Sequence, residues 1–366
     1  MKLEKKYLGL MTVIAGAVCC VPAMAQSSVT MFGTIDSGIT YVSNAGGKHL
    51  LMMDDGVDGP NLWGVRGKED LGNGTQATFE LVDQFHVDTG SFMTNGSLFT
   101  RGATIGLQND RYGKLTIGNQ YDFMTDSLFF SGDEPGEMSG HFYAFRNGPF
   151  DKLDLPDNAT GAFDWDRMAG EVVSNSVKYL SPSFNGFSAG SMYVFGNTAG
   201  SVGAGNGTSF GLNYKQQNFG FNAAYTNLKY TSANTSVRNW GLGAHYDTDA
   251  WKFAALFTTV HNSVNGGSVY EGSVGADYYF TPAVSAGASY MYMKGNAVVD
   301  NNHANELAAN VMYHFSKRTE VYLMGIYQRA NSGANAQING IMSSSADYAS
   351  SGDTQFVARA GLRVRF

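Results

Sequence analysis

Apolar and polar residues alternate along much of the chain, most clearly at the C-terminus. One set of alternate positions there holds Phe356, Ala358, Ala360, Leu362, Val364 and Phe366. The positions between them hold Val357, Arg359, Gly361, Arg363 and Arg365. Because successive side chains of a β-strand point to opposite faces, this segment is predicted to be a strand with one apolar and one polar face.

The same alternation recurs upstream, with aromatic residues near the segment ends. It is found at residues 239–247, 270–280, 306–315 and 320–328. A soluble sheet over an apolar core could show this pattern, but no helical pattern is present that would cover such a core. The recurrence therefore favours strands with lipid on one side and water on the other.

The connections between these segments alternate in length. Tight links lie at 247–250, 281–283 and 316–318. Longer polar stretches lie at 263–267, 295–304 and 331–352. About sixteen strands of roughly ten residues fit between Val29 and Phe366, and this length allows a tilted strand to cross a bilayer. We expect an all-β fold, a sixteen-stranded antiparallel transmembrane β-barrel, whose first and last strands pair because lipid satisfies no open edge.

The first 25 residues have the form of a secretory signal. Three lysines precede an apolar stretch over 7–21, and a small-x-small pattern follows at 23–25. The apolar stretch is short for a spanning helix, and the residues before Cys19 and Cys20 do not form a lipobox. We expect cleavage before Gln26, rather than a retained anchor or a lipoprotein, and a single barrel domain over 26–366.

Composition narrows the possible partners. Both cysteines lie in the signal, so the mature chain has no disulfide. Loss of three lysines and one glutamate with the signal takes the net charge from −7 to −9. An acidic chain is a poor ligand for phosphate backbones, so we expect no nucleic-acid partner.

One connection, over about 122–170, is much longer than the others. A structureless loop of this length is unusual unless it is functional, and a barrel of this size has room to hold it. An exposed external loop would fit its polarity. Its aromatic residues favour a loop packed inside the barrel: Phe129, Phe130, Phe142, Tyr143, Phe145, Phe150, Phe163 and Trp165.

Several motifs carry a family resemblance. They are the opening segment 27–36, Trp63-Gly-Val-Arg-Gly-Lys-Glu-Asp-Leu-Gly72, Tyr112-Gly-Lys-Leu-Thr-Ile-Gly118, Asn175-Ser-Val-Lys-Tyr-Leu-Ser-Pro182 and the terminal Phe366. With these motifs, in this order, the chain resembles the general porins of neisserial and other β-proteobacterial outer membranes. The resemblance implies sixteen strands, a homotrimer and a third extracellular loop that folds inward as the constriction. It also implies contacts with outer-membrane lipids and lipopolysaccharide, and presentation of Phe366 to the barrel-assembly machinery.

Charged residues on the loop and on the wall are candidates for the pore constriction. The loop carries ten acids and three basic residues, and we expect only part of these acids to line the channel, because others could be solvated or bind divalent ions beside lipopolysaccharide. The candidates are Arg66, Arg101 and Lys178 on the wall, and Asp122, Asp126, Asp133, Glu134 and Glu137 on the loop. The C-terminal arginines 359, 363 and 365 are expected nearer the periplasmic mouth.

The resemblance also marks three wall positions where relatives often carry arginine. These positions fall on Leu62, Arg101 and Val172, so only one keeps its charge. A waist narrower than the Debye length of about 8 Å is incompletely screened, and its net charge biases which ions enter. We therefore predict weak to moderate selectivity for cations.

The predicted function is passive diffusion of ions and small hydrophilic solutes through an outer-membrane porin, with no catalysis, cofactor or metal. No HExxH pattern, paired histidine spacing or G-x-S-x-G elbow is present. One alternative is a channel specific for sugars or carboxylates, in which Phe142, Tyr143 and Trp165 could contact sugars. A remote alternative is an outer-membrane hydrolase that would use His141.

Overall fold

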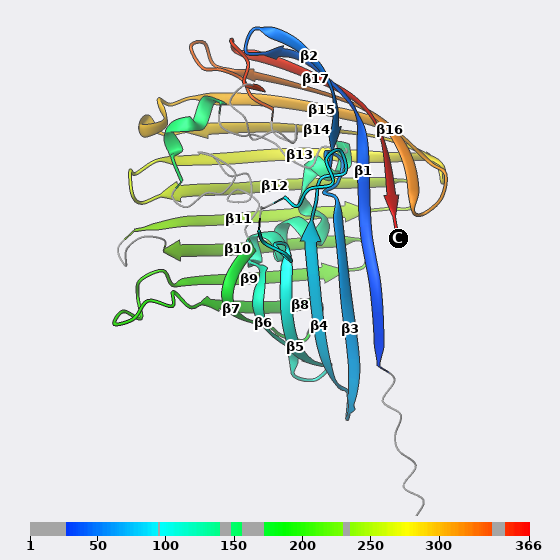
Figure 1. The fold of residues 1–366 in the computed structure, drawn as a ribbon, viewed down its shortest axis with the longest axis vertical. Helices are drawn as coiled ribbons and strands as arrows, with labels where there is room; N and C mark the ends of the chain where they lie inside the picture. Colours follow the sequence, from blue (N-terminus) through cyan, green and yellow to red (C-terminus); the bar gives the residue numbers. More distant parts are fainter. Residues whose placement is uncertain (1–26, 94–95, 140–147, 156–171, 230–234, 339–347) are drawn as a thin grey trace, which may run out of the picture.

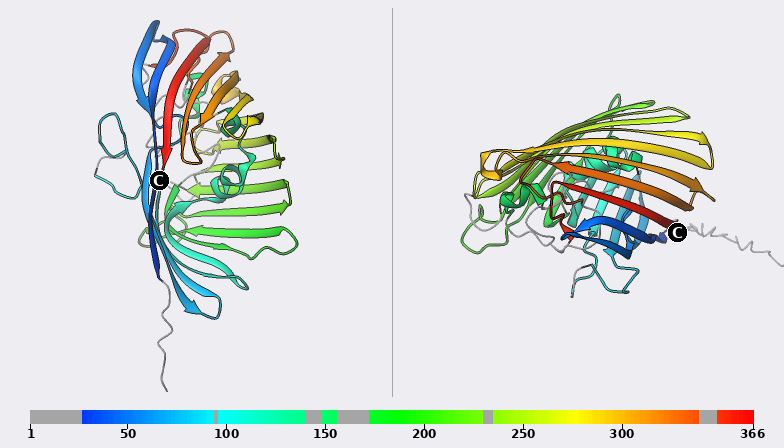
Figure 2. Two further views of the ribbon diagram at one scale, coloured as in Figure 1. Left: turned by 90° about the vertical axis from the view of Figure 1, so that its right-hand side faces the viewer. Right: turned by 90° about the horizontal axis from the view of Figure 1, so that it is seen from above.

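The computed structural model describes residues 27–93, 96–139, 148–155, 172–229, 235–338 and 348–366. The predicted signal peptide lies outside these residues. The described strands form one antiparallel sheet that curves round on itself (Figures 1 and 2). No helix of the described residues is long and apolar enough to cross a membrane.

The sheet has seventeen strand segments in the described chain. The first eight are β1 (Ser28–Ala45), β2 (Lys48–Asp55), β3 (Leu62–Gly72), β4 (Thr75–Gln84), β5 (Gly102–Asn109), β6 (Gly113–Tyr121), β7 (Val172–Leu180) and β8 (Phe187–Val194). The remaining nine are β9 (Gly207–Gln216), β10 (Phe219–Lys229), β11 (Ser236–Asp247), β12 (Trp251–Asn262), β13 (Ser268–Thr281), β14 (Val284–Gly295), β15 (His303–His314), β16 (Thr319–Ala330) and β17 (Thr354–Arg365).

Two of these segments are parts of a single wall strand. The start of β1 pairs with β3 and its later part pairs with β2, so β2 and β3 follow one another along the same neighbour. The residues between them, 56–61, leave the wall. Counted by position in the wall, the ring has sixteen strands, and the predicted sixteen-stranded antiparallel barrel is confirmed.

The ring closes between β1 and β17, which pair from Thr34 opposite Arg365 to Val42 opposite Val357. The backbones of Gly33 and Phe366 exchange two hydrogen bonds of 3.0 and 3.1 Å. The start of β1 and the C-terminus therefore lie at the end of the barrel that carries the short turns. Closure matters because an unpaired backbone group facing lipid would cost several kcal/mol.

The two faces of the wall separate as the alternation predicts. In β16, Leu323 is 65% exposed on the outer face, whereas the neighbouring Tyr322 is 3% exposed on the inner face. Trp240, Val274 and Leu362 likewise lie exposed on the outside. An outer surface of aromatic and aliphatic side chains is typical of contact with lipid.

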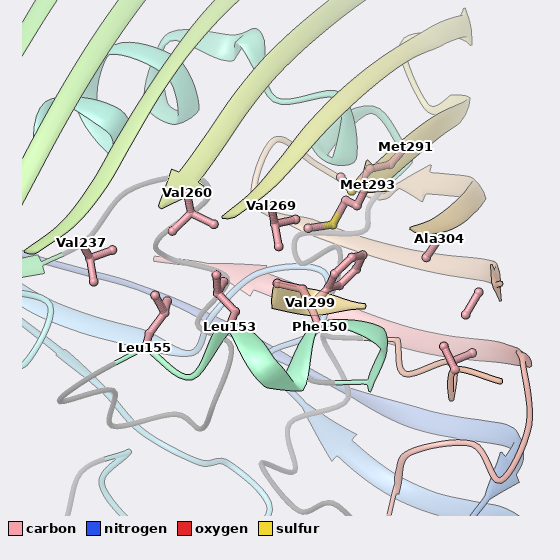
Figure 3. Packing of buried hydrophobic residues seen from close by; sticks show 13 residues of the cluster. Phe150, Leu153, Leu155, Val237, Val260, Val269, Met291, Met293, Val299 and Ala304 are labelled. Carbon is pink, nitrogen blue, oxygen red and sulfur yellow. The ribbon is translucent and has the colours of Figure 1, made fainter. Parts of the chain in front are cut away.

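Apolar contacts also form inside the ring, where loops fold back onto the wall. Figure 3 shows the largest cluster, in which Phe150, Leu153 and Leu155 of the connection between β6 and β7 lie against the inner face. Their wall partners include Val260 and Met293, both at most 1% exposed. The connection between β6 and β7 thus packs on residues of the barrel.

Replacing Gly33 with alanine should weaken the closure. A Cβ at this position would lie 2.4 Å from the ring of Phe366 and 2.5 Å from the backbone oxygen of Leu62. We expect a loss of about 1–3 kcal/mol of stability, as for overpacking elsewhere, measured as a lower midpoint of thermal unfolding in detergent. Gly325→Ala is the control, because its Cβ would meet Phe356 at an ordinary 3.7 Å; equal midpoints for the two variants would contradict the prediction.

Candidate functional site

The connection between β6 and β7 enters the ring as a series of helical turns. They are η1 (Thr125–Asp133), η2 (Pro135–Ser139) and η3 (Gly148–Leu153). Asp122 starts the series, because its carboxylate accepts a hydrogen bond of 3.0 Å from the Thr125 backbone N–H. Phe123 and Leu128 are buried against inward-facing side chains of the wall. Figure 2 shows η1 and η2 within the curve of the strands.

The wall beneath η1 and η2 is lined with glycines. They are Gly190, Gly211, Gly241, Gly243, Gly275 and Gly287, on strands from β8 to β14. A Cβ at Gly287 would lie 1.6 Å from the carbonyl oxygen of Met138, and one at Gly243 would lie 2.3 Å from the Asp133 carboxylate. We call these six positions the glycine bed. The loop lies so close to the wall that larger residues there would displace it.

Hydrogen bonds fix the loop on this bed. The Asp133 carboxylate lies 2.6 Å from His245 Nδ1 and accepts a bond of 2.7 Å from Asn222 Nδ2. Asp122 accepts a bond of 2.6 Å from the Thr226 hydroxyl. Burial raises the pKa of Asp133, and its bonds to His245 and Asn222 oppose that rise. These two carboxylates face the wall and hold the loop.

Glu134 is also turned away from the open lumen. It is 6% exposed, and its side chain accepts a hydrogen bond of 2.9 Å from the Gly136 backbone N–H. Burial raises its pKa well above the ordinary value, and the nearby Glu271 raises it further. Its side chain lines neither of the two cavities described below.

Among the described residues, two cavities lie between the loop and the wall, with volumes of about 940 and 370 Å³. Both are lined by Leu62, Arg101, Tyr121 and Phe130. The cavities therefore adjoin where Leu62 and Arg101 of the wall face the start of the loop. This is the narrow zone in which a passing solute would meet both surfaces.

The smaller cavity contains an ion pair between loop and wall. Lys178 Nζ lies 2.6 Å from the Asp126 carboxylate and donates a bond of 2.9 Å to the Tyr121 carbonyl. Arg101 Nε donates a bond of 2.5 Å to the Gln84 side chain. Positive and negative groups thus lie side by side in this cavity.

The larger cavity is bounded on one side by the loop and on the other by residues 56–61. Glu137 of the loop lines it, as do Asp58 and Arg363 on the opposite side. Arg363 Nη1 lies 2.6 Å from Asp58, and Arg363 Nε also contacts Glu320. Arg363 therefore lines the same cavity as Glu137 of the loop, and this cavity also extends to Pro282 and Lys317 in the short turns. The expected position of Arg363 near the periplasmic mouth stays a prediction.

Residues 56–61 form an inward segment that the sequence analysis did not foresee. The buried Asp36 carboxylate accepts bonds from the backbone N–H groups of Asp58 (2.6 Å) and Gly59 (3.1 Å). Its other oxygen lies 2.7 Å from the Tyr322 hydroxyl and 3.1 Å from Arg359 Nη2. The available signal was the run Asp-Gly-Val-Asp-Gly-Pro at 55–60, because Asp-Gly and Gly-Pro pairs interrupt strands.

A model of the Gram-negative porin family matches residues 11–360 of the chain. The chain belongs to this family of channels. Two similar outer-membrane porins come from Bordetella pertussis (27% identical, covering 84% of this chain and 90% of the relative) and Delftia acidovorans (26%, covering 99% and 100%). The major outer membrane protein P.IB of Neisseria meningitidis is 25% identical, covering 88% of this chain and 95% of the relative. The porin therefore lies in the outer membrane, as predicted.

Solved structures agree on the fold. The anion-selective porin from Comamonas acidovorans superimposes with a TM-score of 0.77 at 21% identity, covering 93% of this porin and 100% of that chain. OmpT of Vibrio cholerae, solved in a trimer form, gives a TM-score of 0.63 at 13% identity, covering 93% and 99%. At these identities the likeness concerns the barrel and not its selectivity.

The remaining predicted site residues lie elsewhere or outside the described chain. Arg66 of the porin is exposed and stacks over the Phe32 ring at 4.9 Å, and it lines neither cavity. Val172, the first residue of β7, pairs with Tyr121, the last residue of β6. Loop residues 140–147 and 156–171 lie outside the part of the chain that the structure describes. They include His141, Phe142, Tyr143, Trp165 and three of the ten acids. All the constriction residues stay predictions.

One group of described residues could hold a metal ion, namely Asp55, His86 and Asp88. Their candidate ligand atoms all lie within 4.8 Å of one another. No spacing rule in the sequence reveals this group, because Asp55 lies on a different strand and 31 positions before His86. His86 and Asp88 lie on the connection between β4 and β5, Asp55 ends β2, and none of the three lines the two pore cavities.

Gly287→Ala tests whether the glycine bed sets the position of the loop. The new Cβ would overlap the Met138 carbonyl, and η2 would have to move inward by about 2 Å to restore a normal contact. We expect a folded channel with lower single-channel conductance in a planar bilayer. Gly272→Ala, with no atom within 4 Å of its Cβ, should conduct like the unchanged porin; an unaltered conductance for Gly287→Ala would refute the assignment.

Proposed function

We propose that this porin is a general diffusion channel, through which ions and small hydrophilic solutes pass without catalysis. The observation that carries the proposal is the pair of adjoining cavities between loop and wall, lined by charges of both signs. Along the two cavities Arg101, Lys178 and Arg363 occur with Asp58, Asp126 and Glu137. A mixed lining of this kind suits many small polar solutes rather than one.

We propose weak to moderate selectivity for cations. The loop is acidic overall, and two positions where relatives often carry arginine are Leu62 and Val172. The positive and negative side chains named above are equal in number, so the proposed preference for cations depends on the other acids of the loop. One uncompensated charge about 8 Å from an ion in water changes its energy by about 0.5 kcal/mol, which alters the cation-to-anion ratio at most about six-fold.

We also propose that the chain is exported with its signal and then assembles as a trimer in the outer membrane. The signal over 1–25 would be cleaved, and Phe366 would be presented to the barrel-assembly machinery. The mature barrel, residues 26–366, would assemble as a homotrimer among outer-membrane lipids and lipopolysaccharide. The exposed aromatic and aliphatic outer face supports a lipid contact.

A solute-specific channel is the second candidate. The observation in its favour is a group of rings in the narrow zone, where Tyr121 and Phe130 pack edge to face at 5.2 Å. Liposome swelling with sugars and carboxylates of graded size separates the two functions. We expect the rate to fall smoothly with solute size, and saturation by one solute at low concentration would favour the specific channel instead.

Neutralising Lys178 and neutralising Asp126, each in a separate variant, should shift the ion selectivity in opposite directions. Lys178→Gln leaves Asp126 uncompensated and should raise the K⁺-to-Cl⁻ permeability ratio, by at most about six-fold. Asp126→Asn leaves Lys178 and should lower it. Reversal potentials under a KCl gradient measure both. Asp110→Asn, in the exposed turn between β5 and β6, is the control; shifts of the same sign for both variants would refute the assignment of this pair to the pore.

A further inference from the structure

Asp55, at the end of β2, has a carboxylate that is held in one orientation. The residue is 1% exposed. Its Oδ2 atom accepts a bond of 2.6 Å from Asn61 Nδ2 and a second bond from the Val87 backbone N–H. The other oxygen, Oδ1, is thereby directed toward the His86 ring, whose Nδ1 lies 3.4 Å away.

The connection between β4 and β5 brings a second carboxylate to the same place. Backbone bonds from His86 N–H to Ser91 O (2.8 Å) and from Gly90 N–H to His86 O (2.9 Å) close a tight turn. Asp88 lies in this turn, exposed to solvent. The connection projects away from the ring of strands (Figure 2), and none of the three residues lines either pore cavity.

The spacing of His86 and Asp55 differs from that of the other histidine–carboxylate pairs in the described chain. His245 and Asp133 lie 2.6 Å apart, and His314 and Glu320 lie 2.9 Å apart. A distance of 3.4 Å is longer than a normal hydrogen bond. It matches the separation of about 3.3 Å between two ligands of a tetrahedral ion with bonds of about 2.0–2.1 Å.

We propose that Asp55, His86 and Asp88 bind a divalent ion of the zinc class. One imidazole and two carboxylates suit such an ion, whereas Ca²⁺ takes six to eight oxygen ligands. The hydrogen bonds from Asn61 and Val87 to Asp55 are the outer contacts that orient a metal ligand. Three protein ligands leave one position for water, and the ion ties the connection between β4 and β5 to the end of β2.

Titration of the folded full-length mature porin with ZnCl₂ in detergent, followed by calorimetry, tests the site. We expect about one ion per chain. His86→Ala and Asp88→Asn should each weaken the binding at least about ten-fold, and both residues lie on the connection between β4 and β5, outside the strands. His49→Ala is the matched control, because His49 is an exposed histidine on β2, the same strand as Asp55.

Two further readouts separate a specific site from adventitious binding. Zn²⁺ should raise the midpoint of thermal unfolding in the unchanged porin and in His49→Ala, but less in His86→Ala, because an ion that binds only the folded state stabilises it. Ca²⁺ at the same concentration should raise the midpoint less than Zn²⁺. The proposal is overturned if the unchanged porin shows no saturable zinc binding, if His86→Ala and Asp88→Asn bind as tightly as the control, or if Ca²⁺ binds equally well.

Discussion

The pore loop lies inside the barrel because the wall beneath it has no side chains at the six positions of the glycine bed. A helical turn is about 10 Å across with its side chains, and it can approach a sheet this closely only where the sheet is bare. At Gly287 the carbonyl of Met138 occupies the space that a Cβ would need. The width of the remaining lumen follows from this contact. Six of the glycines thus have a specific structural role, which is to leave room for the loop against the wall.

The acidic charge of the loop is divided between anchoring and lining. Asp122, Asp133 and Glu134 are buried against the wall, whereas Asp126 and Glu137 line the cavities. The formal charge of the loop therefore overstates the field that a passing ion meets. Opposite the loop, Asp58 of the inward segment 56–61 pairs with Arg363 of β17 in the same space. Among the described residues, the loop side contributes the carboxyl groups of Asp126 and Glu137, whereas the side opposite carries charges of both signs.

The sequence predicted the barrel well because the two-residue period of a strand is local and repeats along the chain. The ends of the long loop, at Tyr121 and Val172, also agreed with the prediction. It did not predict which loop acids face water, because that depends on pairings such as Asp133 with His245, which lie 112 positions apart. The inward segment was missed for a related reason. Its Asp-Gly and Gly-Pro pairs were visible, but only Asp36, on another strand, turns them into a folded element.

The most direct test of the account is a covalent link between the loop and the wall. Ser139 of η2 and Ser289 of β14 have hydroxyl oxygens 2.8 Å apart, and the expected mature chain has no cysteine to compete. In the double variant Ser139→Cys, Ser289→Cys, we expect a disulfide to form on folding. The single-channel conductance of the variant should be the same before and after this disulfide is reduced. Two free thiols under oxidising conditions, or a conductance that changes when the link is reduced, would contradict a loop resting on the glycine bed.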